Sequence, residues 1–239
     1  EQGVATGPDV LVVSVDTWRA DHVGPLANNP RSTPVFDRLS ESGILFERAL
    51  SPIAVTGPSH ASMFTGAGPW RTQMLLNGVP VPTEHKLLSQ RMASAGYRTG
   101  AFVSAYVLDG QLGFQRGFEI YDDDFGSLRG WARTGPGRIH AMLHRYLSPS
   151  HIVERRGDET IDRALSWLSE TSDQPSFLWV HLFDPHGPYS PPHPFDELHY
   201  SGDPRSSEHD SMAKVTNLAA YLKPSLEGIR DIDWVHAQY

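Results

Sequence analysis

Three groups of polar residues have the types and positions that transfer of an anionic group requires. The groups are Asp16 with Thr17, Thr56 with His60 in "TGPSH", and His181 with Asp184 and His186 in "HLFDPHG". Together they provide an acid, a hydroxyl and imidazoles, which can serve as metal ligand, nucleophile and proton donor. Whether they form one site depends on the elements that position them.

The chemistry starts from the hydroxyl of Thr56. A threonine is a poor nucleophile near neutral pH because it is almost wholly protonated, and a nearby divalent cation favours its ionised form. Asp16 supplies an oxygen ligand suited to such a cation. The expected helix start at Thr56 directs backbone N–H groups toward an anion, and Pro58 fits the first turn of that helix. Either His186 or His181 would donate a proton to the leaving oxygen or hold a substrate oxygen.

Each of these residues also has a purely structural interpretation when it is considered alone. Asp16 after a strand can be a helix cap, and Thr56 can be a cap or a turn residue before a helix that begins with proline. His186, followed by Gly-Pro, can be a loop histidine with its hydrogen bonds satisfied. The functional interpretation gains weight only if all three groups meet at one edge of one sheet.

The chain alternates between apolar runs typical of strands and segments with helical spacing, so we predict one α/β domain over residues 1–239. The expected strands are 9–15, 44–50, 97–105 and 175–183, and the expected helices are 33–43, 58–66, 85–96, 158–170 and one that starts within 224–239. "DVLVVSV" and "PSFLWVHLF" read as strands buried on both faces. The carboxyl ends of such strands form the edge where open α/β sheets bind ligands.

Two further segments contain no clear helix or strand pattern. Residues 104–150 show no clear pattern and receive no assignment, and 187–210 read as a long surface loop. Within the former, "YDDDF" (121–125) lacks the alternating acids of a calcium loop, so we interpret it as a solvated turn.

Composition excludes several classes of function. The formal charge of −8 on 239 residues argues against nucleic acid as a partner. No apolar run reaches the roughly 18 residues of a membrane span. The absence of cysteine excludes disulfides and thiolate metal sites. The opening "EQGVATGPDV" is compatible with a processed mature chain or with a piece of a longer one, and we expect an extracytoplasmic location, periplasmic or secreted.

Three blocks of the sequence resemble the N-terminal part of the sulfatase family, within the alkaline phosphatase superfamily. They are "VLVVSVDTWRADHVG", "TPVFDRLSESGILFERALSPIAVTGPSHASMFTG" and "FLWVHLFDPHGPYSPP", and the likeness spans residues 9–192. The resemblance implies an α/β sandwich with a central mixed, largely parallel sheet flanked by helices, and a divalent metal such as zinc, calcium or manganese. It also implies that Asp16 is a metal ligand, that Thr56 holds the nucleophile position, that His186 lies near the leaving group, and that Asn77 contacts the substrate.

The sequence departs from the sulfatase pattern at the nucleophile. Sulfatases carry Cys or Ser where this chain has Thr56, oxidise it to formylglycine, and carry Arg where it has His60. Threonine cannot give that aldehyde. A Thr-x-Pro-[Asn/Ser]-His block is instead similar to the nucleotide pyrophosphatase/phosphodiesterases, in which threonine attacks phosphorus. We therefore expect Thr56 to be the nucleophile, with His60 either a partner of the site or a plain helix-surface histidine. Thr17 replaces the usual second acid, so the expected metal ligands are Asp16, Thr17 and Thr56.

Members of the family also carry a later Ser/Thr-Asp-His-Gly-like block that is missing from these 239 residues. We therefore expect the chain to be the N-terminal portion of a longer domain, whose C-terminal half belongs to the same polypeptide or is a separate partner chain. The leading hypothesis is a metal-dependent hydrolase or transferase of phosphate, phosphonate or sulfate esters that forms a covalent Thr56 intermediate on a small anionic ester. His181 and Asp184 are assigned to substrate binding. The alternatives are a sulfatase-like protein with residual sulfate specificity and a non-catalytic binding protein with an incomplete metal site.

Overall fold

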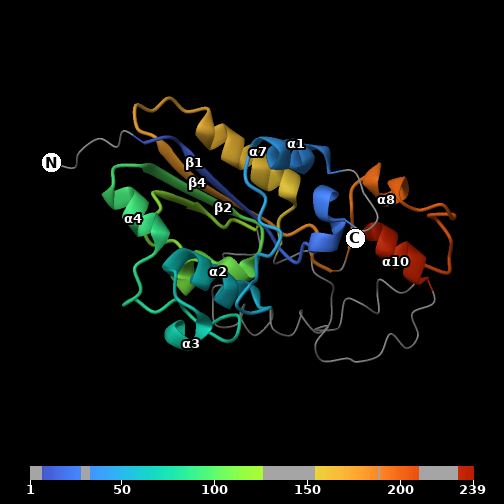
Figure 1. Ribbon diagram of the computed structural model, residues 1–239, viewed down its shortest axis with the longest axis horizontal. Helices are drawn as coiled ribbons and strands as arrows, with labels where there is room; N and C mark the ends of the chain where they lie inside the picture. The colour runs from blue at the N-terminus through green and yellow to red at the C-terminus, as the bar shows by residue number, and fades with distance from the viewer. Residues whose placement is uncertain (1–6, 28–32, 126–153, 188, 210–230) are drawn as a thin grey trace.

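The computed structural model describes residues 7–27, 33–125, 154–187, 189–209 and 231–239. The strands are β1 (Val10–Val15), β2 (Arg98–Val103), β3 (Ile120–Asp122) and β4 (Ser176–Leu182). The α-helices are α1 (Pro34–Ser42), α2 (Thr56–Thr65), α3 (Pro69–Thr72), α4 (Leu88–Ser94), α7 (Gly157–Leu168), α8 (Phe195–Leu198) and α10 (Ile232–Gln238). Short 3₁₀ turns cover Ala20–His22, Gly24–Leu26, Tyr106–Leu108 and Gly110–Leu112. This arrangement is the predicted α/β fold (Figure 1).

The four strands form one parallel sheet in the order β1-β4-β2-β3. The register pairs Ser14 of β1 with His181 of β4, and His181 in turn with Val103 of β2. Because the strands are parallel and in this register, the residues that follow β1, β4 and β2 all leave the sheet at the same edge. The sheet therefore brings the polar segments after 15 and after 182 together.

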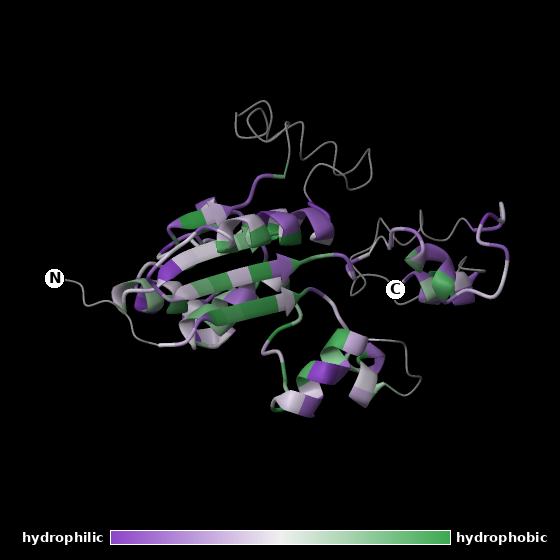
Figure 2. Ribbon diagram, turned by 90° about the horizontal axis from the view of Figure 1, so that it is seen from above, coloured by the Kyte–Doolittle hydropathy of each residue, from purple (hydrophilic) through white to green (hydrophobic). Residues whose placement is uncertain are grey.

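Successive side chains of β4 point to opposite faces of the sheet, so they pack into two separate hydrophobic clusters. Phe177 and Trp179 pack with Phe64 of α2, and the rings of Phe64 and Trp179 have centroids 4.5 Å apart. Leu178 and Val180 pack on the other face against α7. Figure 1 shows α7 on one side of the sheet and α2 and α4 on the other, and Figure 2 shows the strands carrying much of the hydrophobic colouring. His181 continues the row of Phe177 and Trp179, so it points toward α2.

Most predicted elements are confirmed, with shifted ends. The helices expected at 33–43, 58–66, 85–96 and 158–170 correspond to α1, α2, α4 and α7. Helix α7 begins one residue earlier than expected, at Gly157, with Arg156 at the N-cap position. The expected surface loop after residue 187 contains the short helix α8, which packs against α10. Within the described residues, no helix is long and apolar enough to cross a membrane.

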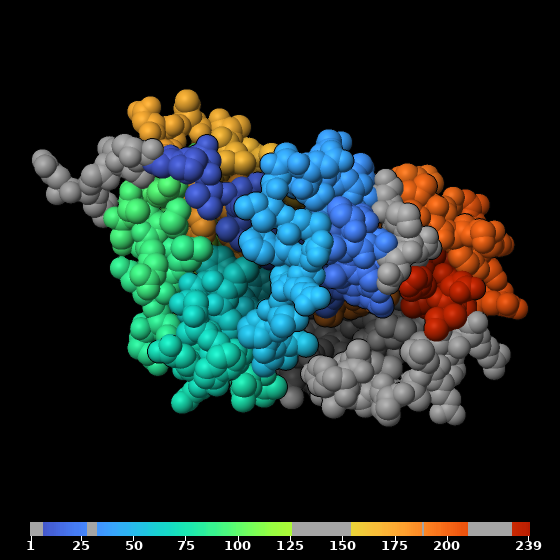
Figure 3. Space-filling view, viewed as in Figure 1, coloured from blue at the N-terminus to red at the C-terminus, as the bar shows by residue number. Residues whose placement is uncertain are grey.

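The prediction of a strand at 44–50 is wrong. This segment is irregular and leaves its large apolar side chains in contact with solvent, with Ile44 82 %, Phe46 74 % and Leu50 92 % exposed. In the space-filling view, the light-blue segment between α1 and α2 lies across the front face (Figure 3). The alternation that suggested a strand has no described partner strand to pair with.

Strand β1 is also less buried than predicted. It pairs with β4 on one side and stands at the edge of the described sheet, and Leu11 and Val13 are 60 % and 52 % exposed. The expectation that this strand is buried on both faces is therefore wrong for the described part of the chain. An apolar run so exposed marks a surface available for contact with another element.

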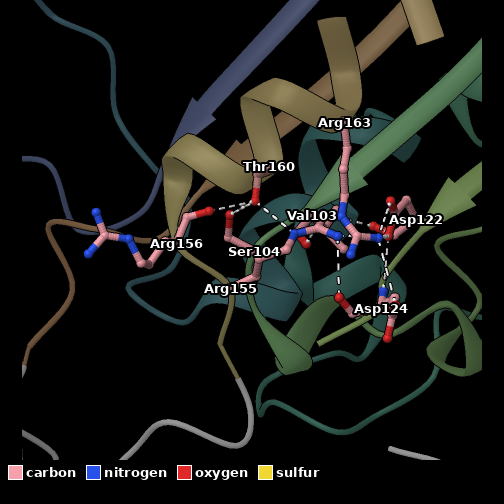
Figure 4. Close-up of polar contacts among 8 residues, drawn as sticks. All are labelled: Val103, Ser104, Asp122, Asp124, Arg155, Arg156, Thr160 and Arg163. Atoms are coloured by element: carbon pink, nitrogen blue, oxygen red, sulfur yellow. Dashed lines mark hydrogen bonds and ion pairs between the residues drawn. The ribbon is translucent and has the colours of Figure 1, made fainter. Parts of the chain in front are cut away.

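The interpretation of "YDDDF" as a solvated turn is wrong for its first two acids. Asp123 is buried, and its Oδ2 accepts from the backbone N–H of Gly110 at 2.8 Å. Asp122 lies on β3 and binds the guanidinium of Arg155, with an Nη1–Oδ1 distance of 2.7 Å, while the Arg155 side chain is only 2 % exposed. Arg155 also donates to the carbonyl of Val103 and to the hydroxyl of Thr160. Arg163 adds a second, more exposed ion pair to Asp122 (Figure 4). These hydrogen bonds and ion pairs of Arg155 and Arg163 connect the start of α7 to β2 and β3.

Candidate functional site

Asp16 and His181 form the centre of the candidate site. Asp16 follows β1 directly and its backbone N–H donates to the carbonyl of Leu182, so the ends of β1 and β4 are joined. The Asp16 carboxylate and the His181 imidazole are both buried, with 3.5 Å between Oδ2 and Nε2. That distance is longer than a hydrogen bond. Among the described residues, Asp16 Oδ2 and both ring nitrogens of His181 have no hydrogen-bond partner.

The surroundings of Asp16 favour its charged form. Burial alone would raise the pKa of this carboxyl group. Interaction with His181, with the Thr56 side chain and with the charge of His186 more than offsets burial, so the pKa lies below its usual range. The direction of this shift means that Asp16 is a carboxylate at neutral pH. Of these neighbours, His181 is the one in direct contact with the Asp16 carboxylate.

Thr56 begins helix α2, as the sequence predicts for a nucleophile at a helix start. Val55 precedes it in an extended conformation as the N-cap. The backbone N–H of Gly57 donates to Oδ1 of Asn77 at 2.8 Å. A Cβ at position 57 would meet that same oxygen at 3.1 Å, so glycine keeps the approach open. Asn77 thus lies beside the nucleophile position, and its amide group retains N–H donors that a substrate oxygen can accept from.

His60 lies beneath the site. The expectation of a plain helix-surface histidine is wrong, because His60 is only 8 % exposed and its ring contacts those of Trp179 and His181. Its Nδ1 is 2.8 Å from the Thr56 carbonyl oxygen and its Nε2 is 3.1 Å from Ser14 Oγ. Burial, and next the neighbouring His181, lower the pKa of His60 to about 4. The imidazole is therefore neutral at pH 7, which argues against a role as proton donor.

His186 and Thr17 lie on the two loops that border the site. The ring of His186 stacks on Phe183 at 4.2 Å between centroids, and Nδ1 is 2.8 Å from the carbonyl of Gly187. Since a carbonyl only accepts, Nδ1 carries a proton, which leaves Nε2 as the atom for chemistry. Thr17 adopts a left-handed backbone conformation, with φ of 53°, and its hydroxyl donates to the carbonyl of Pro185 at 3.0 Å. That contact joins the two loops, and the assignment of Thr17 as a metal ligand stays a prediction.

Asp184 and Glu154 add two more carboxyl groups nearby. Oδ1 of Asp184 accepts from the backbone N–H of Gly157 at 3.1 Å, at the first turn of α7. Glu154 pairs with Ala105 next to β2 in an isolated antiparallel bridge. Burial, and next the charges of Asp16 and Asp184, raise the pKa of Glu154 to about 7. Sequence reasoning missed Glu154, because no motif surrounds it and its position depends on the neighbouring Arg155.

The donor set at Asp16 fits a divalent cation. Two ligand atoms at about 2.1 Å from one ion in tetrahedral geometry lie roughly 3.4 Å apart, and Asp16 Oδ2 and His181 Nε2 are 3.5 Å apart. A buried carboxylate oxygen without a hydrogen-bond partner is also costly unless a cation compensates it. A second group, His193 with Asp196 and Glu197, has ligand atoms within 4.8 Å of one another, but it lies on the surface at α8.

Comparison with known proteins decides the family. The family model "Sulfatase" matches residues 8–235, nearly the whole chain. The chain belongs to the sulfatase family. Its curated relatives include the multifunctional alkaline phosphatase superfamily protein PehA of Trinickia caryophylli, 25 % identical over 83 % of this chain and 46 % of the relative. The uncharacterized sulfatase YidJ of Escherichia coli K12 is 27 % identical over 77 % of this chain and 40 % of the relative. This sulfatase-family chain thus spans less than half of the length of these relatives.

A solved structure supports the same fold. The phosphonate monoester hydrolase of Agrobacterium radiobacter matches with a TM-score of 0.56 and 23 % identity, covering 79 % of this chain and 43 % of that one. Sequence identity at this level establishes the architecture and not the activity. The predicted alkaline-phosphatase/sulfatase architecture is therefore confirmed, while the roles of the individual site residues stay predictions.

Proposed function

We propose that this sulfatase-family protein is a metal-dependent hydrolase, or transferase, of phosphate, phosphonate or sulfate esters, with Thr56 as its nucleophile. The observation that carries the proposal is that Asp16 and His181 lie 3.5 Å apart at the carboxyl edge of the sheet. The start of α2 is joined to the same place by His60, whose ring contacts His181 and whose Nδ1 is 2.8 Å from the Thr56 carbonyl oxygen. The similarity to a phosphonate monoester hydrolase and to sulfatases supports the class of ester. The substrate is a small anionic ester, because the helix start at Thr56 suits a tetrahedral anion.

Asp16 is the first ligand of the divalent cation in this proposal, with Thr56 and Thr17 as the further oxygen ligands predicted from the sequence. His181 lies at ligand distance from Asp16 and is an additional candidate beside its assignment to substrate binding. When bound, a zinc, calcium or manganese ion supplies positive charge that favours the ionised Thr56 hydroxyl. The carboxyl group of Asp184 lies near this place, and a bound cation would favour the charged form of Glu154, whose pKa is otherwise raised to about 7.

The residues of the chain then perform two displacements. In the first, Oγ of Thr56 releases its proton to solvent and bonds to phosphorus or sulfur, while the ester oxygen leaves with a proton from His186. In the second, water attacks the covalent ester, gives a proton to His186, and Thr56 leaves and is protonated by solvent. Asn77 would donate its amide N–H to a non-bridging oxygen in both steps, and Asp184 would orient the substrate from the α7 side.

We further propose that residues 1–239 are one α/β unit that forms the N-terminal portion of a longer, extracytoplasmic domain. Two observations support the longer domain, while the extracytoplasmic location is proposed from the sequence alone. The chain spans 46 % of PehA, and β1 leaves Leu11 and Val13 exposed at the sheet edge. The second half of such a domain, in the same polypeptide or as a separate chain, would cover that edge and supply further metal ligands.

The test is a substrate panel on the full-length protein. Nitrophenyl sulfate, phosphate monoester, phosphate diester and phosphonate ester are assayed after chelation and after addition of zinc, calcium or manganese. The proposal predicts turnover of at least one ester that depends on the metal and is lost in Thr56→Ala and Asp16→Asn. Preference for sulfate would indicate the sulfatase-like alternative. Metal-dependent turnover that persists in Thr56→Ala would contradict the assignment of Thr56 as the nucleophile. Absence of turnover with every ester and metal would indicate a non-catalytic binding protein.

A further inference from the structure

The hydrogen bonds around His60 fix which of its ring nitrogens carries the proton. Nδ1 lies 2.8 Å from the carbonyl oxygen of Thr56, and a carbonyl can only accept, so Nδ1 is the donor. In the neutral imidazole the other nitrogen, Nε2, is then an acceptor. Its neighbour at 3.1 Å is the hydroxyl of Ser14. The hydroxyl of Ser14 therefore donates to His60.

Ser14 is held in that orientation from the other side. The indole Nε1 of Trp179 lies 3.0 Å from Ser14 Oγ, and an indole N–H can only donate. Ser14 thus accepts a hydrogen bond from Trp179 and donates one to His60. The donor and acceptor of these two hydrogen bonds cannot be exchanged, because the indole N–H can only donate. Trp179 is fully buried and belongs to the central core cluster. The chain of donors runs from Trp179 through Ser14 and His60 to the carbonyl of Thr56.

This chain links the nucleophile to the rigid sheet. Ser14 is on β1, two residues before Asp16, and Trp179 is on β4, two residues before His181. Its far end is the backbone of the residue whose hydroxyl must reach the substrate. The two strands that position Asp16 and His181 therefore also set the position of Thr56.

We propose that Ser14 is a positioning residue for the nucleophile, because it holds His60 in the Nδ1–H tautomer that anchors the first turn of α2 through the Thr56 carbonyl. This inference rests on the proposed role of Thr56 for its catalytic consequence, but the hydrogen-bond chain itself does not. The neutral His60 ring joins strand β1 to helix α2 through its two hydrogen bonds. Ser14 has no role in direct contact with the substrate.

The first test needs no activity. Nitrogen-15 NMR of the histidine side chains in the wild-type full-length protein reports which ring nitrogen of His60 is protonated, with His60→Gln assigning the signal. The inference predicts the Nδ1–H tautomer in the wild type and loss of its single, fixed signal pattern in Ser14→Ala. The Nε2–H tautomer in the wild-type protein would overturn it, whatever the variants do.

The second test separates positioning from stability. Ser14→Ala is compared with Ser89→Ala, which removes another hydrogen-bonded serine hydroxyl, donated to the carbonyl of Arg116 and away from the site. Loss of one such hydrogen bond should lower kcat of Ser14→Ala by about five- to tenfold with KM little changed. Ser14→Thr, which keeps a hydroxyl, should restore kcat, and Ser89→Ala should leave it unchanged.

The outcomes distinguish this inference from the proposed function. If kcat falls no more in Ser14→Ala than in Ser89→Ala while Thr56→Ala is inactive, the positioning role of Ser14 is wrong. The assignment of Thr56 as the nucleophile is then unaffected. If the wild type shows the Nδ1–H tautomer of His60 but Thr56→Ala remains active, the hydrogen-bond chain is confirmed and the assignment of Thr56 as the nucleophile is wrong. If Ser14→Thr does not recover kcat although it folds, the hydroxyl is not what positions Thr56.

Discussion

The buried histidine beneath the site predicts a specific loss of stability in mild acid. The pKa of His60 is lowered from 6.5 to about 4, first by burial and then by His181, against the opposing effects of the Thr56 carbonyl and Asp16. In the unfolded chain the imidazole titrates near its ordinary value. The unfolded state therefore binds a proton between these two pKa values while the folded state does not, and the free energy of unfolding falls as the pH falls through that range.

The size of the effect follows from the two pKa values. A tenfold difference in proton affinity between the folded and unfolded states corresponds to about 1.4 kcal/mol, so His60 should cost about 2 kcal/mol of stability between pH ~7.5 and pH ~5. No further contribution from His60 is expected above neutral pH. The matched variant is His60→Gln, whose amide can donate to the Thr56 carbonyl and accept from Ser14 but does not titrate.

Urea denaturation at both pH values measures the prediction. His60→Gln should lose about 2 kcal/mol less than the wild type on acidification, whatever its stability at neutral pH. A double difference near zero would refute the reasoning, because it would mean that His60 titrates as an exposed histidine does. A value of opposite sign would mean that the folded state prefers the charged imidazole.

Three further predictions concern residues around the site. Burial, and next the charges of Asp16 and Asp184, raise the pKa of Glu154 to about 7. The unfolded chain therefore ionises at lower pH than the folded one, and the free energy of unfolding falls as the pH rises from the ordinary pKa of glutamate through 7. Glu154→Gln should therefore raise the free energy of unfolding at about pH 8 by up to about 3 kcal/mol, with little effect near pH 4. Arg155→Met should cost about 3–5 kcal/mol in denaturation, because it leaves Asp122 without its buried partner. The half-exposed control Arg163→Met should cost less than about 1 kcal/mol, and equal costs would contradict the role of the buried pair. Asn77→Asp keeps the acceptor for Gly57 but adds negative charge, so KM for an anionic ester should rise about tenfold or more without loss of stability, and an unchanged KM would remove Asn77 from the substrate site.

The strands β1 and β4 and the meeting of Asp16 with His181 could be predicted from local sequence. "DVLVVSV" and "PSFLWVHLF" are continuous apolar runs that end in polar residues, and parallel pairing alone then brings Asp16 and His181 to one edge. The start of α2 could likewise be read from Thr56 and Pro58. These features depend on contacts between neighbours in sequence or on one simple rule of sheet geometry.

The errors involve residues whose environment is set by partners far along the chain. Asp122 is paired with the buried Arg155, which is 33 positions away, so "YDDDF" alone reads as a solvated turn. His60 is buried against Ser14, which is 46 positions away, so a histidine on a short helix carries no local sign of burial. Glu154 had no pattern to identify it. The strand expected at 44–50 has suitable alternation, but pairing depends on a partner that propensity cannot reveal.

The most direct test of the proposed mechanism is to trap the covalent intermediate. The full-length, metal-loaded protein is mixed with an aryl phosphonate or aryl sulfate ester, quenched in acid during turnover, digested and analysed by peptide mass spectrometry. We predict that the phosphonyl or sulfuryl group is attached to Thr56, and that no adduct and no turnover occur in Thr56→Ala. A group attached to a different residue, or turnover that persists in Thr56→Ala, would contradict the mechanism.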